Sequence, residues 1–350
     1  MALLARVLAG PLMVDVRAGA VAGLADLLAD RRIATTGRIA VAVGSGVGAE
    51  VRSSVEASLS APIFEVDGGS LASARELSDR LRGQQFEALV GIGGGGSLDV
   101  AKWAATAVGL PFVSVATTLT HDGLASPVAA LEDNGWKGSY GVQPPIAVLV
   151  DLDLVRSAPL SHARSGIGEV VSNLSAVADW AMARDVTGEP FDGLAAAMAT
   201  AAALSILHEP RTPPDQVGLE ALADALIVSG LAMTAAGTSR PCSGACHEIS
   251  HSIDRLHPGL ALHGEQAAVG AMFASFLRDD ARLKDIDECF TRNGVPRLPG
   301  DIGLDADQFT AVVLAAPDTR PGRFTILERL EMDAVETRQR VDAFIEAFDR

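Results

Sequence analysis

The strongest constraint on the fold is a regular alternation of strand-like and helix-like segments over the first 150 residues. Short apolar runs are followed by longer segments with helical spacing, and several junctions contain glycine. The predicted strands are residues 38–44, 62–66, 86–93, 111–117 and 146–155, and the helices between them are residues 51–59, 71–83 and 97–109. This order predicts a parallel, Rossmann-like sheet with helices on both faces.

The second half of the chain has a different character and shows no convincing strand pattern. Its predicted helices are residues 161–185, 191–208, 215–237, 242–256, 263–283, 306–315 and 331–348. A chain of 350 residues, 48% of them hydrophobic, exceeds what one compact core usually holds. We therefore predict an α/β domain over residues 1–158 and an all-helical domain over residues 159–350.

Composition restricts the partners and the compartment. The net charge of −16 argues against nucleic acid, because phosphate backbones bind to basic surfaces, and leaves a small-molecule substrate. Cys242, Cys246 and Cys289 form no CxxC pair, which indicates a reducing compartment. The first residues lack a signal-peptide pattern, and no apolar run reaches the roughly 20 residues of a membrane span. We expect a cytoplasmic protein.

A glycine-rich turn, GIGGGGSLDVAK (91–102), lies between a predicted strand and a predicted helix. Bare backbone lets N–H groups approach a pyrophosphate, and the start of a helix favours its negative charge. Ser97 is expected to cap the helix and Asp99 to lie in its first turn. The predicted cofactor-binding residues here are Gly94, Gly95, Gly96, Ser97 and Asp99. The alternative is a tight turn without a ligand, for which one or two glycines would suffice.

Two further features bear on the cofactor and the substrate. The strand 38–44 ends without the acid that usually binds an adenosine ribose, so NADP is expected as well as NAD. The segment 115–127 follows the fourth strand and gathers polar residues where α/β proteins bind ligands. We predict that this loop contacts a ligand; the alternative is a polar turn with an Asp-Gly corner. Its polar residues are Thr117, Thr118, Thr120, His121, Asp122 and Ser126.

Residues 246–266 contain four of the seven histidines. His247 and His251 are four residues apart and share one helix face, and His263 begins a second helical run after a Pro-Gly break. Imidazoles from two helices can hold a divalent metal or form a proton relay. Glu169 lies among small and apolar residues, where a buried carboxylate needs a partner such as a metal.

Four of these segments, GIGGGGSLDVAK, TTLTHDGLASP, HEISHSID and LHGEQAAVG, resemble the sn-glycerol-1-phosphate dehydrogenase family in order and spacing. That family belongs to the superfamily of iron-containing alcohol dehydrogenases, glycerol dehydrogenases and dehydroquinate synthases. The resemblance implies a dehydroquinate synthase-like fold with the metal-binding and catalytic residues in the helical domain. We also expect a homo-oligomer.

Carried over by position, the resemblance places the metal ligands on Glu169, His247 and His263. It implies zinc, with iron used by related enzymes. His251 matches a histidine near the substrate with a proton-relay role, and Asp122 matches an acid that contacts the substrate. Thr117 and Thr120 match positions on the nicotinamide side of the cofactor.

Three positions depart from the family pattern and bear on the substrate. Glu169 stands where this branch typically has Asp, and Asn173 stands where it typically has Lys. Cys246 replaces the acid that usually precedes the first metal histidine. Loss of a cation at position 173 would weaken recognition of a phosphorylated substrate.

The predicted function is a metal-dependent NAD(P)-linked oxidoreductase that interconverts a small polyol phosphate and its ketone. The substrates would be sn-glycerol 1-phosphate and dihydroxyacetone phosphate. One alternative is a sugar-phosphate cyclase, a lyase that uses NAD transiently; Glu169 favours it, whereas the HDGLASP loop and Asn173 argue against it. The sequence also leaves open a dehydrogenase for an unphosphorylated polyol and a relative that only binds nucleotide.

Overall fold

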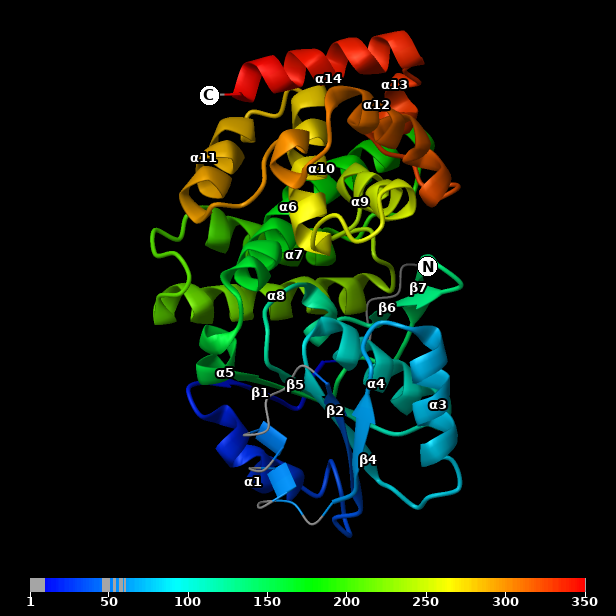
Figure 1. Cartoon of the computed structure of the whole chain (residues 1–350), viewed down its shortest axis with the longest axis vertical. Coiled ribbons are helices and arrows are strands. Elements are labelled where there is room, and N and C mark those ends of the chain that lie inside the picture. Colours follow the sequence, from blue (N-terminus) through cyan, green and yellow to red (C-terminus); the bar gives the residue numbers. More distant parts are fainter. Residues whose placement is uncertain (1–9, 46–50, 53–54, 57–58, 60, 350) are drawn as a thin grey trace, which may run out of the picture. The chain divides into compact units, whose positions relative to one another are not determined.

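The computed structural model describes residues 10–349, apart from 46–50, 53–54, 57–58 and 60. The chain divides into two compact units (Figure 1). The first, which we call the α/β unit, comprises Met1–Thr118, Gly123–Ala158 and Met233–Gly237. The second, the helical unit, comprises Leu119–Asp122, Pro159–Ala232 and Thr238–Arg350. A short loop segment thus belongs to the helical unit although it lies inside the first half of the sequence.

The α/β unit is built on a six-stranded, entirely parallel sheet with the strand order β1-β8-β5-β4-β2-β3. Every residue of the central strands β2, β4, β5 and β8 is buried, as expected when helices cover both faces. The strands are β1 (Met13–Arg17), β2 (Ile39–Gly44), β3 (Ile63–Val66), β4 (Ala88–Gly93), β5 (Phe112–Ala116) and β8 (Ala147–Asp151). The predicted parallel sheet is confirmed.

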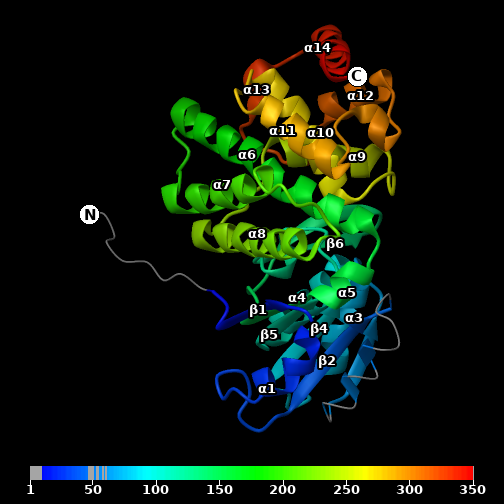
Figure 2. The ribbon, with the colours of Figure 1, turned by 90° about the vertical axis from the view of Figure 1, so that its left-hand side faces the viewer.

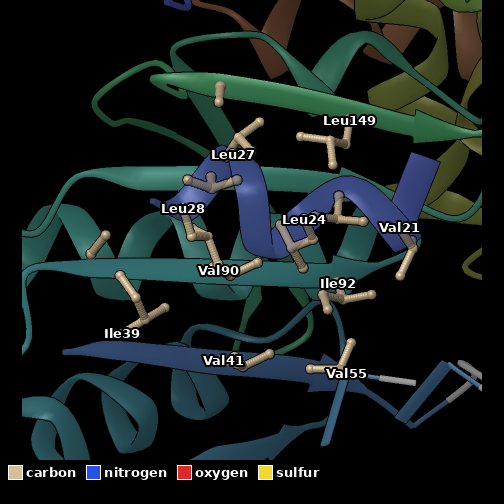
Figure 3. Packing of buried hydrophobic residues seen from close by; sticks show 14 of the residues in the cluster. Val21, Leu24, Leu27, Leu28, Ile39, Val41, Val55, Val90, Ile92 and Leu149 are labelled. Atoms are coloured by element: carbon tan, nitrogen blue, oxygen red, sulfur yellow. The ribbon is translucent and has the colours of Figure 1, made fainter. Parts of the chain in front are cut away.

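The helices of this unit are α1 (Leu24–Leu28), α3 (Leu71–Leu81), α4 (Gly95–Val108) and α5 (Leu152–Ser157). Figure 3 shows how η1 (Ala20–Gly23) and α1 cover one face of the sheet. Leu24, Leu27 and Leu28 point toward aliphatic side chains of β4 and β8, including Val90, Ile92 and Leu149. This burial of branched side chains is the main stabilising contribution on that face.

Three features of the α/β unit differ from the sequence-based expectation. The strand predicted over 146–155 ends at Asp151, because the Asp151 carboxylate caps α5 by accepting from Asp153 N (3.1 Å). Strand β1 and the hairpin of β6 (Val128–Asp133) and β7 (Trp136–Gly141) were not predicted. Asn134 and Gly135 both have positive φ, so an Asn-Gly turn joins the hairpin. The helix predicted over 51–59 lies largely outside the described residues.

The helical unit contains no strand among its described residues, as predicted. Helices α6 and α7 lie side by side (Figure 2), and α10 packs against both α6 and α9. The helices are α6 (Leu160–Thr187), α7 (Gly193–Leu207), α8 (Gln216–Ala236), α9 (Ala245–Leu256), α10 (His263–Leu277), α11 (Leu283–Asn293), α12 (Ala306–Ala315), α13 (Ile326–Leu330) and α14 (Ala334–Phe348). Helix α8 ends in the α/β unit.

The single helix predicted over 263–283 is wrong. Helix α10 ends at Leu277, and Asp279 adopts a left-handed φ of 52°. Asp280 then accepts a hydrogen bond from Arg282 N (2.9 Å), and a separate helix, α11, begins at Leu283. An aspartate tolerates the left-handed region and bonds backbone nearby, so two consecutive aspartates here end the helix.

Helix α8 is long and apolar enough to cross a membrane by length and composition alone. However, 61% of its most apolar stretch is buried inside the protein. It also carries Glu220 and Asp224. A buried core helix can be as long and as apolar as a membrane-spanning helix, so α8 alone is weak evidence for a membrane span.

Candidate metal centre and cofactor loop

Three potential metal ligands converge inside the helical unit. Glu169 lies on α6, His247 on α9, and His263 is the first residue of α10. Their ligand atoms all lie within 4.8 Å of one another. Glu169 Oε2 is 3.5 Å from His247 Nε2 and 3.8 Å from His263 Nε2, distances too long for good hydrogen bonds. A carboxylate and two imidazoles around one point are the donor set of a catalytic divalent metal site.

Glycines beside the ligands allow the helices to approach this closely. A Cβ added to Gly168, next to Glu169, would overlap the Gly264 carbonyl oxygen of α10. A Cβ added to Gly264, next to His263, would overlap the Ser165 carbonyl oxygen of α6. The two helices therefore meet backbone to backbone. Any side chain at either glycine would push them apart and separate the ligands.

The charge state of Glu169 fits a cation site. Its Oε2 is buried and has no hydrogen-bond partner among the described residues. Burial by itself raises the pKa of the Glu169 carboxyl, but His247, His263 and His121 outweigh it and lower the pKa to about 2. Burial likewise disfavours a charged His247, yet Cys246 and Glu169 raise its pKa to about 10. A proton is thus held where a metal ion would displace it.

Hydrogen bonds fix the orientation and the tautomer of His263. Gln266 Nε2 donates to Asp254 Oδ1 (3.0 Å) and to the Ala261 carbonyl (3.2 Å), so its amide oxygen accepts from Ser250 Oγ (2.9 Å). The single hydroxyl proton of Ser250 is therefore used. Its oxygen, 3.0 Å from His263 Nδ1, must accept from that nitrogen. With the proton on Nδ1, a neutral His263 ring has its lone pair on Nε2, the nitrogen near Glu169, as metal ligation requires.

His251 lies beside the three ligands without being one of them. Its ring centroid is 5.8 Å from that of His263 and 6.4 Å from that of His247. Its Nε2 is 3.0 Å from Arg320 Nη2. A guanidinium can only donate, so Nε2 accepts this bond and carries no proton. The proton-relay role of His251 stays a prediction.

Asp122 is buried and belongs to a hydrogen-bonded chain within the helical unit. Ser229 Oγ donates to Asp122 Oδ2 (2.8 Å) and accepts from Asn173 Nδ2 (3.0 Å). Asn173 is only 1% exposed, and its amide is engaged with Ser229. Asn173 is therefore a buried neutral side chain that, through Ser229, helps to fix Asp122.

The glycine loop opens α4 in the α/β unit, and two expectations about it are wrong. Gly94 is the N-cap residue, without a side-chain cap, so Ser97 does not cap the helix. Ser97 lies in the first turn instead, and a Cβ on Gly44 would overlap its hydroxyl. Asp99 lies beyond the first turn and is 2% exposed. Its carboxylate is 3.2 Å from Lys102 Nζ and accepts from Ala130 N (3.1 Å), because burial of both charges requires pairing.

The start of α4 fits the pyrophosphate of a dinucleotide. Gly95 and Gly96 form the first two positions of the helix and leave its N–H groups uncovered by side chains. Thr117 N donates to the Gly93 carbonyl (3.0 Å), and this bond holds the loop after β5 beside the glycines. Thr118 Oγ1 is buried without a partner among the described residues and lies 3.1 Å from where a Cβ on Gly94 would be. An uncapped helix start beside an unpartnered hydroxyl suits an anion.

Thr120 is assigned to a different unit from this loop. It belongs to the helical unit, where its carbonyl accepts from Ser165 Oγ (3.0 Å). Ser165 Oγ also accepts from Gly264 N (3.1 Å), next to His263. The structure thus groups Gly94, Thr117 and Thr118 in one unit and places Thr120 near the metal centre in the other.

Comparison with known proteins defines the class first. Residues 15–159 match the family model for iron-containing alcohol dehydrogenase. A probable glycerol dehydrogenase from Sinorhizobium meliloti 1021 superposes with a TM-score of 0.79 at 21% identity, covering 99% of both chains. An iron-containing alcohol dehydrogenase from Thermococcus thioreducens gives a TM-score of 0.72 at 16% identity, covering 97% of this chain and all (100%) of that one. The chain has the fold of this dehydrogenase superfamily, including the dehydroquinate synthase-like arrangement.

The sequence relatives are more specific. A glycerol-1-phosphate dehydrogenase (NAD(P)+) of Thermofilum pendens is 38% identical over 337 residues, which are 92% of this chain and 94% of that protein. The enzyme of the same name from Pyrococcus furiosus is 36% identical over 76% of this chain and 78% of that protein. The chain belongs to the glycerol-1-phosphate dehydrogenase family, and the resemblance seen in its motifs is confirmed.

The structure adds a role for His121, which the sequence placed in the ligand-contacting loop: it is close enough to lower the pKa of Glu169. Sequence reasoning missed Ser229 and Arg320, which bond two of the predicted site residues. Ser229 is 107 residues from Asp122, and Arg320 is 69 residues from His251. Neither has a local motif that would reveal its partner.

Proposed function

We propose that this protein is a metal-dependent, NAD(P)-linked dehydrogenase that interconverts sn-glycerol 1-phosphate and dihydroxyacetone phosphate. The observation that carries the proposal is the convergence of Glu169, His247 and His263, whose ligand atoms all lie within 4.8 Å of one another. Membership of the glycerol-1-phosphate dehydrogenase family supports the choice of substrate.

Glu169, His247 and His263 would hold one divalent ion, which we propose is zinc, with Fe²⁺ as the alternative. Three protein ligands leave coordination positions for substrate oxygens. The bound ion supplies Lewis acidity, which makes the secondary hydroxyl of the substrate easier to deprotonate. Ser250 contributes by holding His263 in the ligating tautomer.

The remaining residues of the site have distinct roles in this proposal. Asp122, fixed by Ser229, would accept a hydrogen bond from a substrate hydroxyl and so orient the polyol. His251, which lies beside the ligands, would take part in relaying the substrate proton. Gly94, Gly95 and Gly96 would bind the pyrophosphate of NAD or NADP through backbone N–H groups, with Thr117 and Thr118 beside them. Ser97 and Asp99 would support this loop by packing.

The proposal extends to the cellular context. The three cysteines are free and buried, in keeping with a reducing compartment, and we propose the cytoplasm. We also propose that residues 1–158 serve chiefly the cofactor and residues 159–350 chiefly the metal and the substrate. A homo-oligomer stays a prediction, to be tested by light scattering coupled to size-exclusion chromatography.

The test is a substrate screen with purified protein and added zinc. Glycerol 1-phosphate, glycerol 3-phosphate, glycerol and dihydroxyacetone phosphate are each assayed with both nicotinamide cofactors. We expect stoichiometric NAD(P)H turnover with glycerol 1-phosphate and dihydroxyacetone phosphate. Phosphate release from a sugar phosphate without net NADH formation would contradict the proposal and identify a cyclase. Turnover of glycerol alone would identify an unphosphorylated polyol as the substrate.

A further inference from the structure

Binding of a phosphorylated substrate is favoured by a cation near the metal centre. The contacts of the lysine in the helical unit do not link it to that centre. Of the three lysines, Lys102 and Lys137 belong to the α/β unit, and Lys102 is paired with Asp99. Lys284 is on α11, largely exposed, and 3.6 Å from Glu288. Asn173 is neutral and bonded to Ser229. Within the helical unit the strongest remaining candidates are its arginines, which stay charged at neutral pH.

Arg320 is the arginine whose position fits. It follows η4 (Pro317–Thr319), and its Nη2 lies 3.0 Å from His251 Nε2. The His251 ring is in turn 5.8 Å from the ring of His263. The guanidinium thus lies one side chain beyond the imidazoles of the metal centre. Arg320 is half-buried, so a small ligand can reach it while water is partly excluded.

A second guanidinium adds to the positive charge. Arg323 donates to the Ser243 carbonyl and to Ser239 Oγ (3.0 Å), both neutral acceptors. Within the described part of the chain it forms no ion pair. Arg240, by contrast, is paired through two nitrogens with the Glu189 carboxylate (2.7 and 2.5 Å). Arg323 therefore brings a cation that its direct partners do not neutralise.

The two guanidinium groups are close enough to repel each other. Burial, and after it the charges of Arg320 and Arg240, lower the pKa of Arg323 to about 10, although Glu248 and Glu189 partly offset them. Arg323 is therefore still charged at neutral pH. Partly desolvated like charges are unfavourable, and an anionic ligand between or beside them removes that cost. A bound divalent ion would add further positive charge to this region.

We infer that Arg320 binds the phosphate group of the substrate, a phosphomonoester of a small polyol, and that Arg323 strengthens this anion subsite. The inference rests on the proposed function. In glycerol 1-phosphate only one carbon and one oxygen separate the hydroxyl-bearing carbon from phosphorus. A substrate with its secondary hydroxyl at the metal centre would therefore place the phosphate just beyond the imidazoles. A planar guanidinium binds phosphate through paired N–H donors.

The kinetic test compares Arg320→Gln with Arg329→Gln, which removes an exposed arginine on α13. For Arg320→Gln we expect KM for glycerol 1-phosphate to rise by at least about 10-fold, as for loss of a hydrogen bond to a charged group. The loss of kcat/KM in the same variant should be at least about 10-fold larger for glycerol 1-phosphate than for unphosphorylated glycerol, because only the former carries the phosphate. A mere structural role would lower both activities by the same factor. Equal KM values for the two variants would overturn the inference.

If the enzyme oxidises no polyol phosphate, the proposed function is refuted, but the anion subsite can still be tested by binding. Inorganic phosphate is titrated calorimetrically into the zinc-loaded protein and its variants. We expect Arg320→Gln to bind phosphate at least about 10-fold more weakly than Arg329→Gln. Arg320→Lys should restore only part of the affinity, because lysine keeps the charge but not the paired donors. Zinc content and melting temperature confirm that each variant is folded. Phosphate affinity that is independent of residue 320 would overturn the inference.

Discussion

His263 illustrates how neighbouring side chains determine the chemistry of one residue. Ser250 donates its only hydroxyl proton to the amide oxygen of Gln266. The oxygen of Ser250 is therefore left to accept a hydrogen bond from Nδ1–H of His263. In the neutral ring this leaves the lone pair on Nε2, 3.8 Å from Glu169 Oε2. Without this chain of donors the imidazole could present a proton to the centre and would not bind a metal.

We predict that His263→Ala lowers zinc affinity by at least about 100-fold and abolishes activity, since only two ligands remain. NADH affinity should be nearly unchanged, because the glycine loop belongs to the other unit. Metal analysis measures the loss of zinc, and fluorescence titration measures the affinity for NADH. His208→Ala, at the exposed end of α7, is the control. Unchanged turnover in His263→Ala would refute the metal assignment.

A subtler prediction concerns the hydroxyl behind the ligand. Ser250→Ala should lower zinc affinity by about 10–100-fold, because the Nδ1–H of His263 loses its acceptor. Ser252→Ala is a matched control on the same helix. The Ser252 hydroxyl donates to the Val312 carbonyl and bonds no metal ligand. Competition with a zinc chelator measures both affinities. Equal affinities for the two variants would show that Ser250 does not set the tautomer.

At the scale of elements, the closeness of helices determines the site more than the choice of ligands does. Helices α6, α9 and α10 each carry one ligand, and α10 packs against both of its partners. Gly168 and Gly264 lie at the α6–α10 contact, next to Glu169 and His263. The spacing of the ligands is therefore a property of the helix packing.

We predict that Gly264→Ala destabilises the protein by about 1–3 kcal/mol or more, because its methyl group overlaps the Ser165 carbonyl. It should also weaken zinc binding, since α6 and α10 must separate. Gly193→Ala, at the start of α7 with nothing within 4 Å, is the control and should be neutral or mildly stabilising. Denaturant unfolding and metal titration test this. A stable Gly264→Ala variant with normal zinc affinity would contradict it.

The glycine loop makes a second prediction at this scale. Gly94 has an ordinary extended φ of −78°, so Gly94→Ala should leave the backbone unstrained. Its methyl group would instead occupy the space beside Thr118, and we expect NADH affinity to fall by about 10-fold or more. Gly141→Ala in β7, with open space around it, is the control. Unaltered NADH binding in Gly94→Ala would place the cofactor elsewhere.

At the scale of the whole molecule, two units with separate cores carry separate sites. The glycine loop lies in the α/β unit, and all three metal ligands lie in the helical unit. The segment Leu119–Asp122 is the exception, because it leaves β5 and joins the helical unit before the chain returns at Gly123. This excursion places Asp122 and Ser229 in the same unit.

Ligand binding should therefore protect each unit locally. We predict that zinc slows amide hydrogen exchange around Glu169, His247 and His263, because a bound metal suppresses local opening of the helices that hold it. NADH should slow exchange in residues 93–97. Mass spectrometry after exchange, with and without a chelator, measures the effect. Zinc protection that persists in His263→Ala would be incompatible with the proposed centre.

The sequence by itself determined what depends on short-range pattern. Alternating segments predicted the parallel sheet, the His247–His251 spacing predicted a shared helix face, and four glycines predicted the bare start of α4. These features follow from the periods of strands and helices and from the lack of a Cβ, which act over a few residues.

Tertiary structure alone decided the contacts that link distant segments. It directed Asp99 to Lys102 and Ala130, Asn173 to Ser229, and Arg320 to His251. Side chains of these types can bond many partners, and no local pattern selects among them. Packing selects the partner, because a buried polar group must find its hydrogen bonds among whatever the fold brings within reach.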